Sequence, residues 1–301
     1  MATLAGSGKV DPVSEARGRP LFDSVLELIW RVGPASRAEI ARQTGLSRST
    51  VSEIVADLLA TGLVAEAGDG PSRGGRRPIL VAFQDRAHVI LGVDMGASHI
   101  SVALTDLRGE ILSWRHSNHP VRDDPNGAIS LMLELCQDCL NEQAKRASSL
   151  MGIGVAVPCP LDPRYPNRLS EVVLPAWAGF NLGESLSGRF GVPVFLDNDA
   201  NLGAVAEHWW GGGKGLEDFA YIKVGTGVGA GYMIRGDIYR GATGVAGEIG
   251  HLIIDPAGNP CVCGNRGCLA TFVGSEELVE RARRLAPSYP GSSLGTGEIS
   301  I

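Results

Sequence analysis

The sequence predicts an α/β protein in two parts: a small helical unit with a hairpin, followed by a larger body of two lobes. Three short helical patterns and a pair of strands occupy residues 20–84, and in residues 88–301 two glycine-rich turns between apolar strands lie about 130 residues apart. The length of 301 residues allows two or three domains, since a domain usually holds about 100–200 residues.

Composition excludes several classes of protein. The hydrophobic share of 44% is too high for a mostly disordered chain. No apolar run reaches the roughly 18 residues that a membrane span needs, and residues 1–19 lack the apolar core of a signal peptide. We therefore expect a cytoplasmic protein without a membrane partner.

Charge is distributed unevenly along the chain. Residues 1–86 hold 11 basic and 10 acidic residues, a net charge of +1, and the remaining 16 basic and 23 acidic residues give −7. A near-neutral unit with local arginine clusters ahead of an acidic body fits a small DNA-reading module on a larger domain.

Residues 20–84 show the element order of a winged helix-turn-helix, after a flexible tail at residues 1–19. An apolar stripe with three- and four-residue spacing predicts the first helix. Ser36 begins a capping box for the second helix, and Ser47 caps the third. Gly45 provides the tight turn between these two helices, and a pair of short strands follows around a glycine-rich tip.

The third helix and the tip of the strand pair carry the candidate DNA contacts. Small or hydrogen-bonding side chains on the helix suit base edges, and the three arginines of the tip suit phosphates or a narrow minor groove. The alternative is a protein-interaction module with a solvated basic loop, but the order of the elements favours DNA binding. The candidates are Arg48, Ser49, Thr50 and Ser52 on the helix and Arg73, Arg76 and Arg77 on the tip.

Two turns of the body are candidate phosphate loops. Asp94 and Gly96 follow one strand, and Gly225, Thr226 and Gly227 join two others. Glycines let the backbone approach a polyphosphate, and an aspartate at a strand end can hold its Mg²⁺. No helix follows the second loop, which excludes the Rossmann and Walker loops. Either turn alone could be a bend without a ligand, but the pair predicts the duplicated actin-like sugar-kinase architecture. The expected lobes are residues 88–196 and 197–301.

Asp199 stands where a strand passes into a helix. A carboxylate in this place could be the general base that takes a proton from a sugar hydroxyl during phosphoryl transfer. It could also be a helix N-cap, a position that favours Asp and Asn, and spacing alone favours the cap.

Four potential metal ligands lie within 18 residues: His251, Cys261, Cys263 and Cys268. One imidazole and three thiolates complete a tetrahedral set, which predicts a structural Zn²⁺ with no open position for catalysis. Buried free thiols are the alternative, but the compact spacing favours the metal. The metal would also fix the neighbouring Glu248.

Distinctive motifs are spread along nearly the whole chain. They are ARQTGLSRSTVSEIV and SRGGRRP in the first unit, and DMGAS, LDNDAN, AEHWWGGGKG, VGTGVGAG, GEIGH and CVCGNRGC in the body. Together they resemble the ROK family of repressors and sugar kinases, and specifically its transcriptional regulators. The resemblance implies a hexose site made by Asn198, Asp199, Glu248 and His251, with His251 also binding zinc. It also matches Asp199 to the catalytic base of the kinases, for which ATP and Mg²⁺ would be cofactors.

The sequence departs from the family's kinases in four respects. Ala270 stands where the kinases have a sugar-binding glutamate. Cys159 replaces the glycine of their Pro-Gly-Pro sugar loop. Ser98 and His99 replace Thr and Lys at the first phosphate turn. The chain also stops before the segment that, in the family, completes the second lobe and holds the adenosine site, so we expect that lobe to be incomplete. Either the sequence is a fragment or the natural protein lacks the nucleotide site. These departures weigh against kinase activity.

We therefore expect a sugar-responsive DNA-binding repressor of carbohydrate genes rather than an enzyme. It would bind operator DNA as a homodimer or homotetramer, because helix-turn-helix proteins usually read paired half-sites. A hexose or hexose derivative would change its affinity for DNA. An ATP-dependent hexose kinase with a DNA module is the main alternative, and a body that serves only as a dimerisation scaffold is another.

Overall fold

A computed structural model describes residues 20–71, 77–147 and 149–292. It divides into two compact units. The N-terminal unit extends to His88 and also includes the turn Asp106–Glu110, and the second unit comprises the rest of the chain. Among the described residues, no helix is both long and apolar enough to cross a membrane.

The N-terminal unit is a winged helix-turn-helix, as the sequence predicts. The predicted caps are present: the Ser36 hydroxyl accepts from the N–H of Glu39 at 3.2 Å, and the Ser47 hydroxyl accepts from the N–H of Thr50 at 3.1 Å. Gly45 has a φ of 71°, a left-handed conformation that glycine adopts without strain, and it ends the second helix. The elements are α2 (Pro20–Val32), β1 (Ala35–Ser36), α3 (Arg37–Thr44), α4 (Arg48–Thr61), β2 (Val64–Asp69) and β3 (Ile79–Phe83), with the sheet in the order β1-β3-β2.

The three helices and the sheet of this unit share one core. Side chains at helical spacing turn inward from α2 and α4, and the central strand β3 contributes Val81. Removal of these side chains from water is the main source of stability in a unit this small. The fully buried members are Val25, Ile29, Ile40, Val51, Val55, Leu58 and Val81.

The turn between β5 (His99–Asp106) and β6 (Ile111–Asn118) belongs to the N-terminal unit. Arg108 donates from Nε to the Asp85 carboxylate at 2.6 Å and from a terminal nitrogen to the carbonyl of Trp30 at 2.6 Å. Its guanidinium lies 4.6 Å from the centre of the Trp30 ring, within range of a cation–π interaction. The sequence patterns did not indicate this contribution.

Internal hydrogen bonds hold this turn in shape. Asp106 is 3% exposed, and its carboxylate accepts from the N–H groups of Arg108 at 2.8 Å and Glu110 at 3.0 Å. The N–H of Leu107 donates to the carbonyl of Asp85 at 3.0 Å. These hydrogen bonds fix the backbone of the turn, and therefore the position from which Arg108 contacts Asp85 and Trp30.

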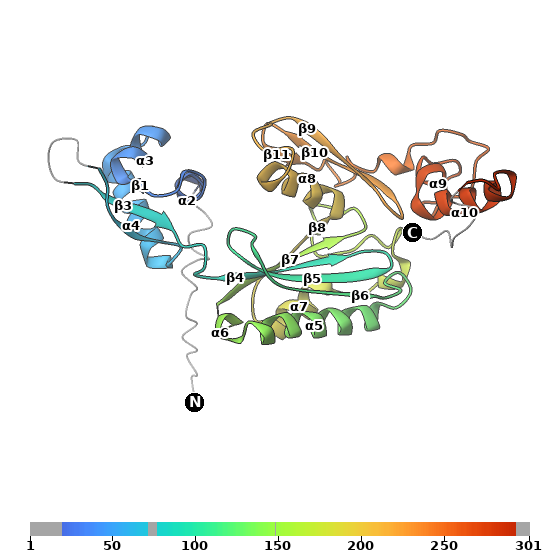
Figure 1. Cartoon of the computed structure of the whole chain (residues 1–301), viewed down its shortest axis with the longest axis horizontal. Coiled ribbons are helices and arrows are strands. Elements are labelled where there is room, and N and C mark those ends of the chain that lie inside the picture. Colours follow the sequence, from blue (N-terminus) through green and yellow to red (C-terminus); the bar gives the residue numbers. More distant parts are fainter. Residues whose placement is uncertain (1–19, 72–76, 148, 293–301) are drawn as a thin grey trace, which may run out of the picture. The chain divides into compact units, whose positions relative to one another are not determined.

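The first lobe of the second unit is a five-stranded sheet with α5 and α7 on one face (Figure 1). The strand order is β6-β5-β4-β7-β8; β4, β7 and β8 pair in parallel, and β5 pairs with β6 in the antiparallel sense. Inward side chains of the sheet and the helices form a continuous core. The remaining elements are β4 (Val89–Met95), α5 (Pro125–Glu142), α6 (Ala144–Ala147), β7 (Leu150–Val157), η1 (Pro175–Trp177), α7 (Leu182–Phe190) and β8 (Val194–Asn198).

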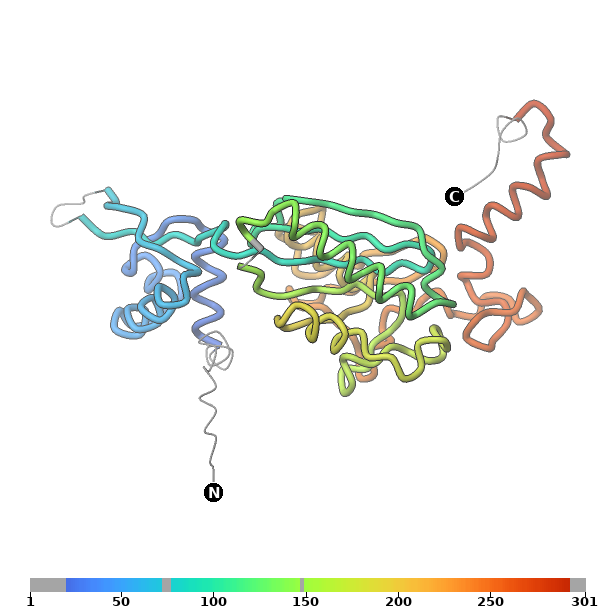
Figure 2. Tube along the Cα trace, turned by 90° about the horizontal axis from the view of Figure 1, so that it is seen from below, coloured from blue at the N-terminus to red at the C-terminus, as the bar shows by residue number. Residues whose placement is uncertain are grey.

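The second lobe is a three-stranded antiparallel sheet of order β11-β10-β9 with α8 packed against it. Glycines allow the close approach: a Cβ on Gly231 would lie 2.3 Å from the carbonyl oxygen of Ala200, and one on Gly203 would lie 2.4 Å from the ring of Tyr221. Beyond the sheet, α10 runs away from it (Figure 2). The elements are α8 (Asp199–Trp210), β9 (Phe219–Val224), β10 (Val228–Ile234), β11 (Asp237–Tyr239), η2 (Ile249–His251), α9 (Ala270–Val273), α10 (Ser275–Leu285) and η3 (Ala286–Ser288).

Candidate metal centre and ligand site

The four predicted metal ligands come together in the second lobe. The ligand atoms of His251, Cys261, Cys263 and Cys268 all lie within 4.8 Å of one another. The Cys261 sulfur is 3.4 Å from Nδ1 of His251, and the sulfurs of Cys263 and Cys268 are 3.7 Å apart. A tetrahedral site with metal–sulfur bonds of about 2.3 Å has ligand-to-ligand edges of roughly 3.5–3.8 Å. The cluster could therefore hold a metal ion.

A folded-back loop brings the last cysteine to the other ligands. Ile253 pairs with Cys268 as an antiparallel bridge, so the chain returns beside its own start. Gly264 and Gly267 have φ values of 88° and 67°, and a Cβ on Gly267 would lie 1.5 Å from the carbonyl oxygen of Asp255. Only glycine fits this return, which explains the glycines between the cysteines.

The segment before the first metal ligand lies directly on β10. A Cβ on Gly247 would lie 1.8 Å from the carbonyl oxygen of Ala230, and one on Gly250 would lie 2.2 Å from that of Val228. The N–H of Ala230 donates to the carbonyl of Gly247 at 2.8 Å. Both glycines are therefore required for this packing, which fixes the backbone around Glu248.

Glu248 and His251 are neighbours on this fixed segment. Nε2 of His251 is 3.7 Å from a carboxylate oxygen of Glu248, while Nδ1 faces Cys261. Burial raises the pKa of Glu248, and the nearby Asp199 raises it further. Burial also raises the pKa of the Cys159 thiol to about 12, with smaller contributions from Glu248 and Asp199. Glu248, Asp199 and Cys159 therefore lie near enough for their charges to influence one another.

Asn198, and not Asp199, is the N-cap of α8. Its side-chain oxygen accepts from the N–H groups of Ala200 at 2.9 Å and Asn201 at 3.2 Å, and its amide nitrogen donates to the carbonyl of Cys159 at 3.3 Å. The capping interpretation of Asp199 is therefore wrong. Asp199 is the first residue of the helix, and its carboxylate is directed elsewhere.

Two basic partners of this site were missed by sequence reasoning. Lys223 on β9 donates to the Asp199 carboxylate. Arg240 donates from Nε at 3.0 Å to Asp197, whose side chain is 12% exposed. The alternation along β9 could have indicated the first pair, because it places Lys223 on the same face as Tyr221, which packs on α8.

A histidine covers the first candidate phosphate turn. Nε2 of His99 lies 3.2 Å from an Asp94 carboxylate oxygen, and a Cβ on Gly96 would lie 2.2 Å from the His99 ring. The imidazole therefore occupies the space that a glycine would leave open to a phosphate.

The second candidate turn is tight and touches the start of α10. The N–H of Gly225 donates to the carbonyl of Gly227 at 2.9 Å, and the carbonyl of Gly225 accepts from the N–H of Ser275 at 2.8 Å. Thr226 is half-buried between them. Phosphate binding at either turn stays a prediction.

The candidate DNA contacts on α4 lie at its N-terminal end. Arg48, Ser49 and Ser52 are exposed and Thr50 is half-buried. The hydroxyl of Ser52 donates to the carbonyl of Arg48 at 2.8 Å. Arg77 is exposed, whereas Arg73 and Arg76 lie outside the described residues. DNA contact by these side chains stays a prediction.

Comparison with known families assigns both units. The model of the ROK family matches residues 90–297. The chain belongs to the ROK family. A second model, that of the MarR family, matches residues 24–77, which cover most of the winged helix-turn-helix of this ROK protein.

Relatives of this ROK protein include named repressors. It is 35% identical to the xylose repressor of Bacillus spizizenii over 256 residues, which cover 85% of this chain and 66% of the relative. It is 31% identical to the transcriptional dual regulator NagC of Escherichia coli over 280 residues, or 92% of this chain and 67% of NagC. The chain thus spans about two thirds of the length of the curated relatives that it matches.

Solved structures give the same fold. A ROK family transcriptional regulator, a homologue of the Escherichia coli MLC protein, superposes with a TM-score of 0.78 at 26% identity, covering 97% of this chain and 72% of that chain. A ROK family glucokinase from Streptomyces griseus, in complex with glucose and AMPPNP, reaches a TM-score of 0.59 at 29% identity, covering 70% and 66%. The predicted fold class, a winged helix-turn-helix ahead of a sugar-kinase-like α/β body, is confirmed.

Proposed function

We propose that this ROK protein is a sugar-responsive repressor that binds operator DNA through its N-terminal unit. The observation that carries the proposal is a winged helix-turn-helix, with Arg48, Ser49 and Ser52 exposed on α4, in one chain with a ROK domain. Relatives named as xylose and N-acetylglucosamine repressors support it. A dimer or tetramer would place two such helices on paired half-sites.

The sugar would bind beside the metal cluster. Asn198, Asp199, Glu248 and His251 are the proposed binding residues, and they supply the carboxylates and hydrogen-bonding groups that sugar hydroxyls need. The sugar would act by binding one conformation of the protein more tightly than another, which changes the population able to bind DNA.

A structural Zn²⁺ is the metal that the donor set fits best. Three thiolates and one imidazole fill all four positions of a tetrahedral zinc site. Bound zinc would hold the loop of residues 252–269 and orient the His251 ring, and His251 in turn lies beside Glu248. The metal would thus support the geometry of the sugar site without taking part in a reaction.

The test is a titration of the chain onto a labelled duplex from the region upstream of its own gene, at fixed salt. We expect tight, sequence-dependent binding that D-xylose, N-acetylglucosamine or D-glucose relieves. Arg48→Ala should weaken specific binding, because it removes an exposed cation at the N-terminal end of α4. Arg146→Ala, on α6 of the body, is the matched control and should leave it unchanged. Absence of specific binding would reject the proposal.

A hexose kinase remains the second candidate, because Asp199 and the glycine turn at 225–227 are present. Three observations oppose it: His99 covers Gly96, Lys223 binds Asp199, and Ala270 stands where the kinases carry a glutamate. Sugar-dependent release of ADP from ATP that disappears in Asp199→Asn would establish the kinase. We expect no such release.

A further inference from the structure

Lys223 reaches the proposed sugar site from the second lobe's sheet. On β9 it shares one face with Phe219 and Tyr221, and this face is turned toward α8. Its ammonium group donates to Oδ2 of Asp199, the first residue of α8. The Asp199 side chain is 14% exposed and the Lys223 side chain 39%, so the pair lies at the edge of the site and is open to a ligand.

Asp199 is available for this contact because its neighbour caps the helix. The Asn198 side-chain oxygen accepts the hydrogen bonds from the N–H groups at the start of α8. The Asp199 carboxylate is therefore not needed as the helix cap. The Lys223 side chain also lies beside the glycine turn, with Cε 3.9 Å from the position of a Cβ on Gly225. The end of the Lys223 side chain thus contacts the carboxylate and lies beside this turn.

The other proposed sugar-binding residues have few free hydrogen-bond donors. Asp199 and Glu248, when ionised, can only accept hydrogen bonds. The Asn198 side chain already accepts twice and donates once, which leaves one N–H. Nδ1 of His251 faces the metal cluster, so the ring keeps one N–H, at Nε2, which lies 3.7 Å from a Glu248 carboxylate oxygen. Lys223 carries three N–H donors, and the contact with Asp199 uses one of them.

We propose that Lys223 is a specificity-determining residue of the sugar site. Asp199 accepts a hydrogen bond from one sugar hydroxyl while Lys223 donates to the oxygen of the adjacent hydroxyl, so the pair recognises two neighbouring hydroxyls together. A charged donor beside a carboxylate can bind one hydroxyl as an acceptor and its neighbour as a donor, so the effector is a sugar with both of these hydroxyls free. This inference rests on the proposed function, since it describes the same site.

The test measures sugar affinity of the full, metal-loaded chain by isothermal titration with D-xylose, D-glucose and N-acetylglucosamine. Lys223→Met keeps the length of the side chain and removes the charge, and it should raise the Kd of the sugar that binds by about 10-fold or more. Lys223→Arg should retain most of the affinity, because it retains the charge. Lys214→Met, on the exposed segment after α8, is the matched control and should bind like the wild type. Thermal melting confirms that each variant is folded.

Monodeoxy analogues of the bound sugar locate the contact. One analogue should lose affinity for the wild type but not for Lys223→Met, because the lost hydroxyl has no partner in that variant. If Lys223→Met binds every sugar and analogue as the wild type does, the inference is overturned while the proposed function stands. If the wild type binds none of the three sugars, the proposed function fails and the inference fails with it.

Discussion

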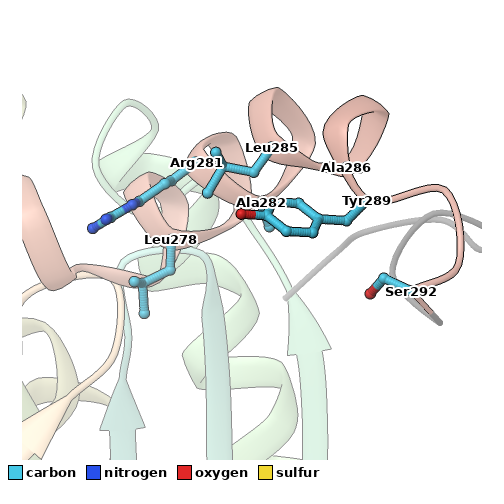
Figure 3. A pocket seen from close by; sticks show the side chains of 7 residues that line it. All are labelled: Leu278, Arg281, Ala282, Leu285, Ala286, Tyr289 and Ser292. Carbon is cyan, nitrogen blue, oxygen red and sulfur yellow. The ribbon is translucent and has the colours of Figure 1, made fainter.

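The two lobes of the second unit differ in how deeply their apolar side chains are buried. In the first lobe the sheet, α5 and α7 enclose a continuous core in which Leu104 and Met132 are fully buried. In the second lobe Ile222 on β9 is 50% exposed and Leu278 on α10 is 46% exposed. A pocket of about 340 Å³ lies along α10 (Figure 3). The side chains in its wall are Leu278, Arg281, Ala282, Leu285, Ala286, Tyr289 and Ser292.

The difference indicates that the second lobe depends on other means of support. Glycines at 203, 231, 247 and 250 let backbone and side chains approach closely, and the four metal ligands gather the loop that follows. The apolar residues of that loop contribute little, because Leu252 and Val262 are about 60% exposed. We therefore expect the first lobe to be stabilised by burial and the loop of the second lobe by the proposed metal.

Removal of the proposed metal should give the largest effect. With a strong chelator we expect residues 252–269 to lose protection against hydrogen–deuterium exchange, because in small zinc sites the binding free energy of the metal is folding free energy. The strands β4–β8 should keep their protection. Zinc content and segment-resolved exchange, measured on the same samples, check both statements.

Two cysteine variants provide the matched comparison for this experiment. Cys261→Ser removes a ligand and should reproduce the effect of the chelator, whereas Cys139→Ala changes a buried thiol of the first-lobe core and should retain the metal. Equal protection of residues 252–269 with and without metal would show that packing, and not the metal, holds the loop.

The second prediction compares one leucine from each lobe. Leu104→Ala should lower the free energy of unfolding by about 2–5 kcal/mol, because it leaves a cavity in a close-packed core. Leu278→Ala should cost less than about 1 kcal/mol, since nearly half of that side chain is already in water. Urea denaturation of both variants gives the two values. Similar losses would mean that α10 is packed in solution as firmly as the first-lobe core.

Local signals in the sequence predicted much of this structure. Ser36 and Ser47 cap their helices because a hydroxyl directly before a helix can accept hydrogen bonds from N–H groups in its first turn. The metal cluster was found for a similar reason, since three cysteines with intervening glycines can meet only in a tight loop. Such features depend on residues that are close together in the chain.

The contacts that sequence reasoning missed join residues far apart in the chain. Lys223 and Asp199 are 24 residues apart, and Arg108 lies 78 residues beyond Trp30. No sequence pattern pairs Arg108 with Trp30, and the alternation along β9 places Lys223 on the face toward α8 without naming Asp199 as its partner. The choice between Asn198 and Asp199 as the cap was also beyond the sequence, because both residue types are good caps and only the register of α8 decides between them.

The smallest predicted effect concerns the turn Asp106–Glu110, which joins β5 to β6 and belongs to the N-terminal unit. Arg108→Ala removes hydrogen bonds to Asp85 and to the Trp30 carbonyl together with the contact on the Trp30 ring. Because the Arg108 side chain is 35% exposed, solvent weakens these interactions, and we expect a loss of about 1–2 kcal/mol. The loss should appear as faster hydrogen–deuterium exchange in α2 and β3, with the second lobe unchanged.

Arg86→Ala is the control for this effect. Arg86 lies 3.6 Å from Glu110 of the same turn, but both side chains are at least 60% exposed, so its removal should change stability by less than about 0.5 kcal/mol. Unchanged exchange in Arg108→Ala would show that the turn only rests against the winged helix. Equal losses in the two variants would assign the effect to surface charge, because net charge changes identically in both while only Arg108 contacts Trp30.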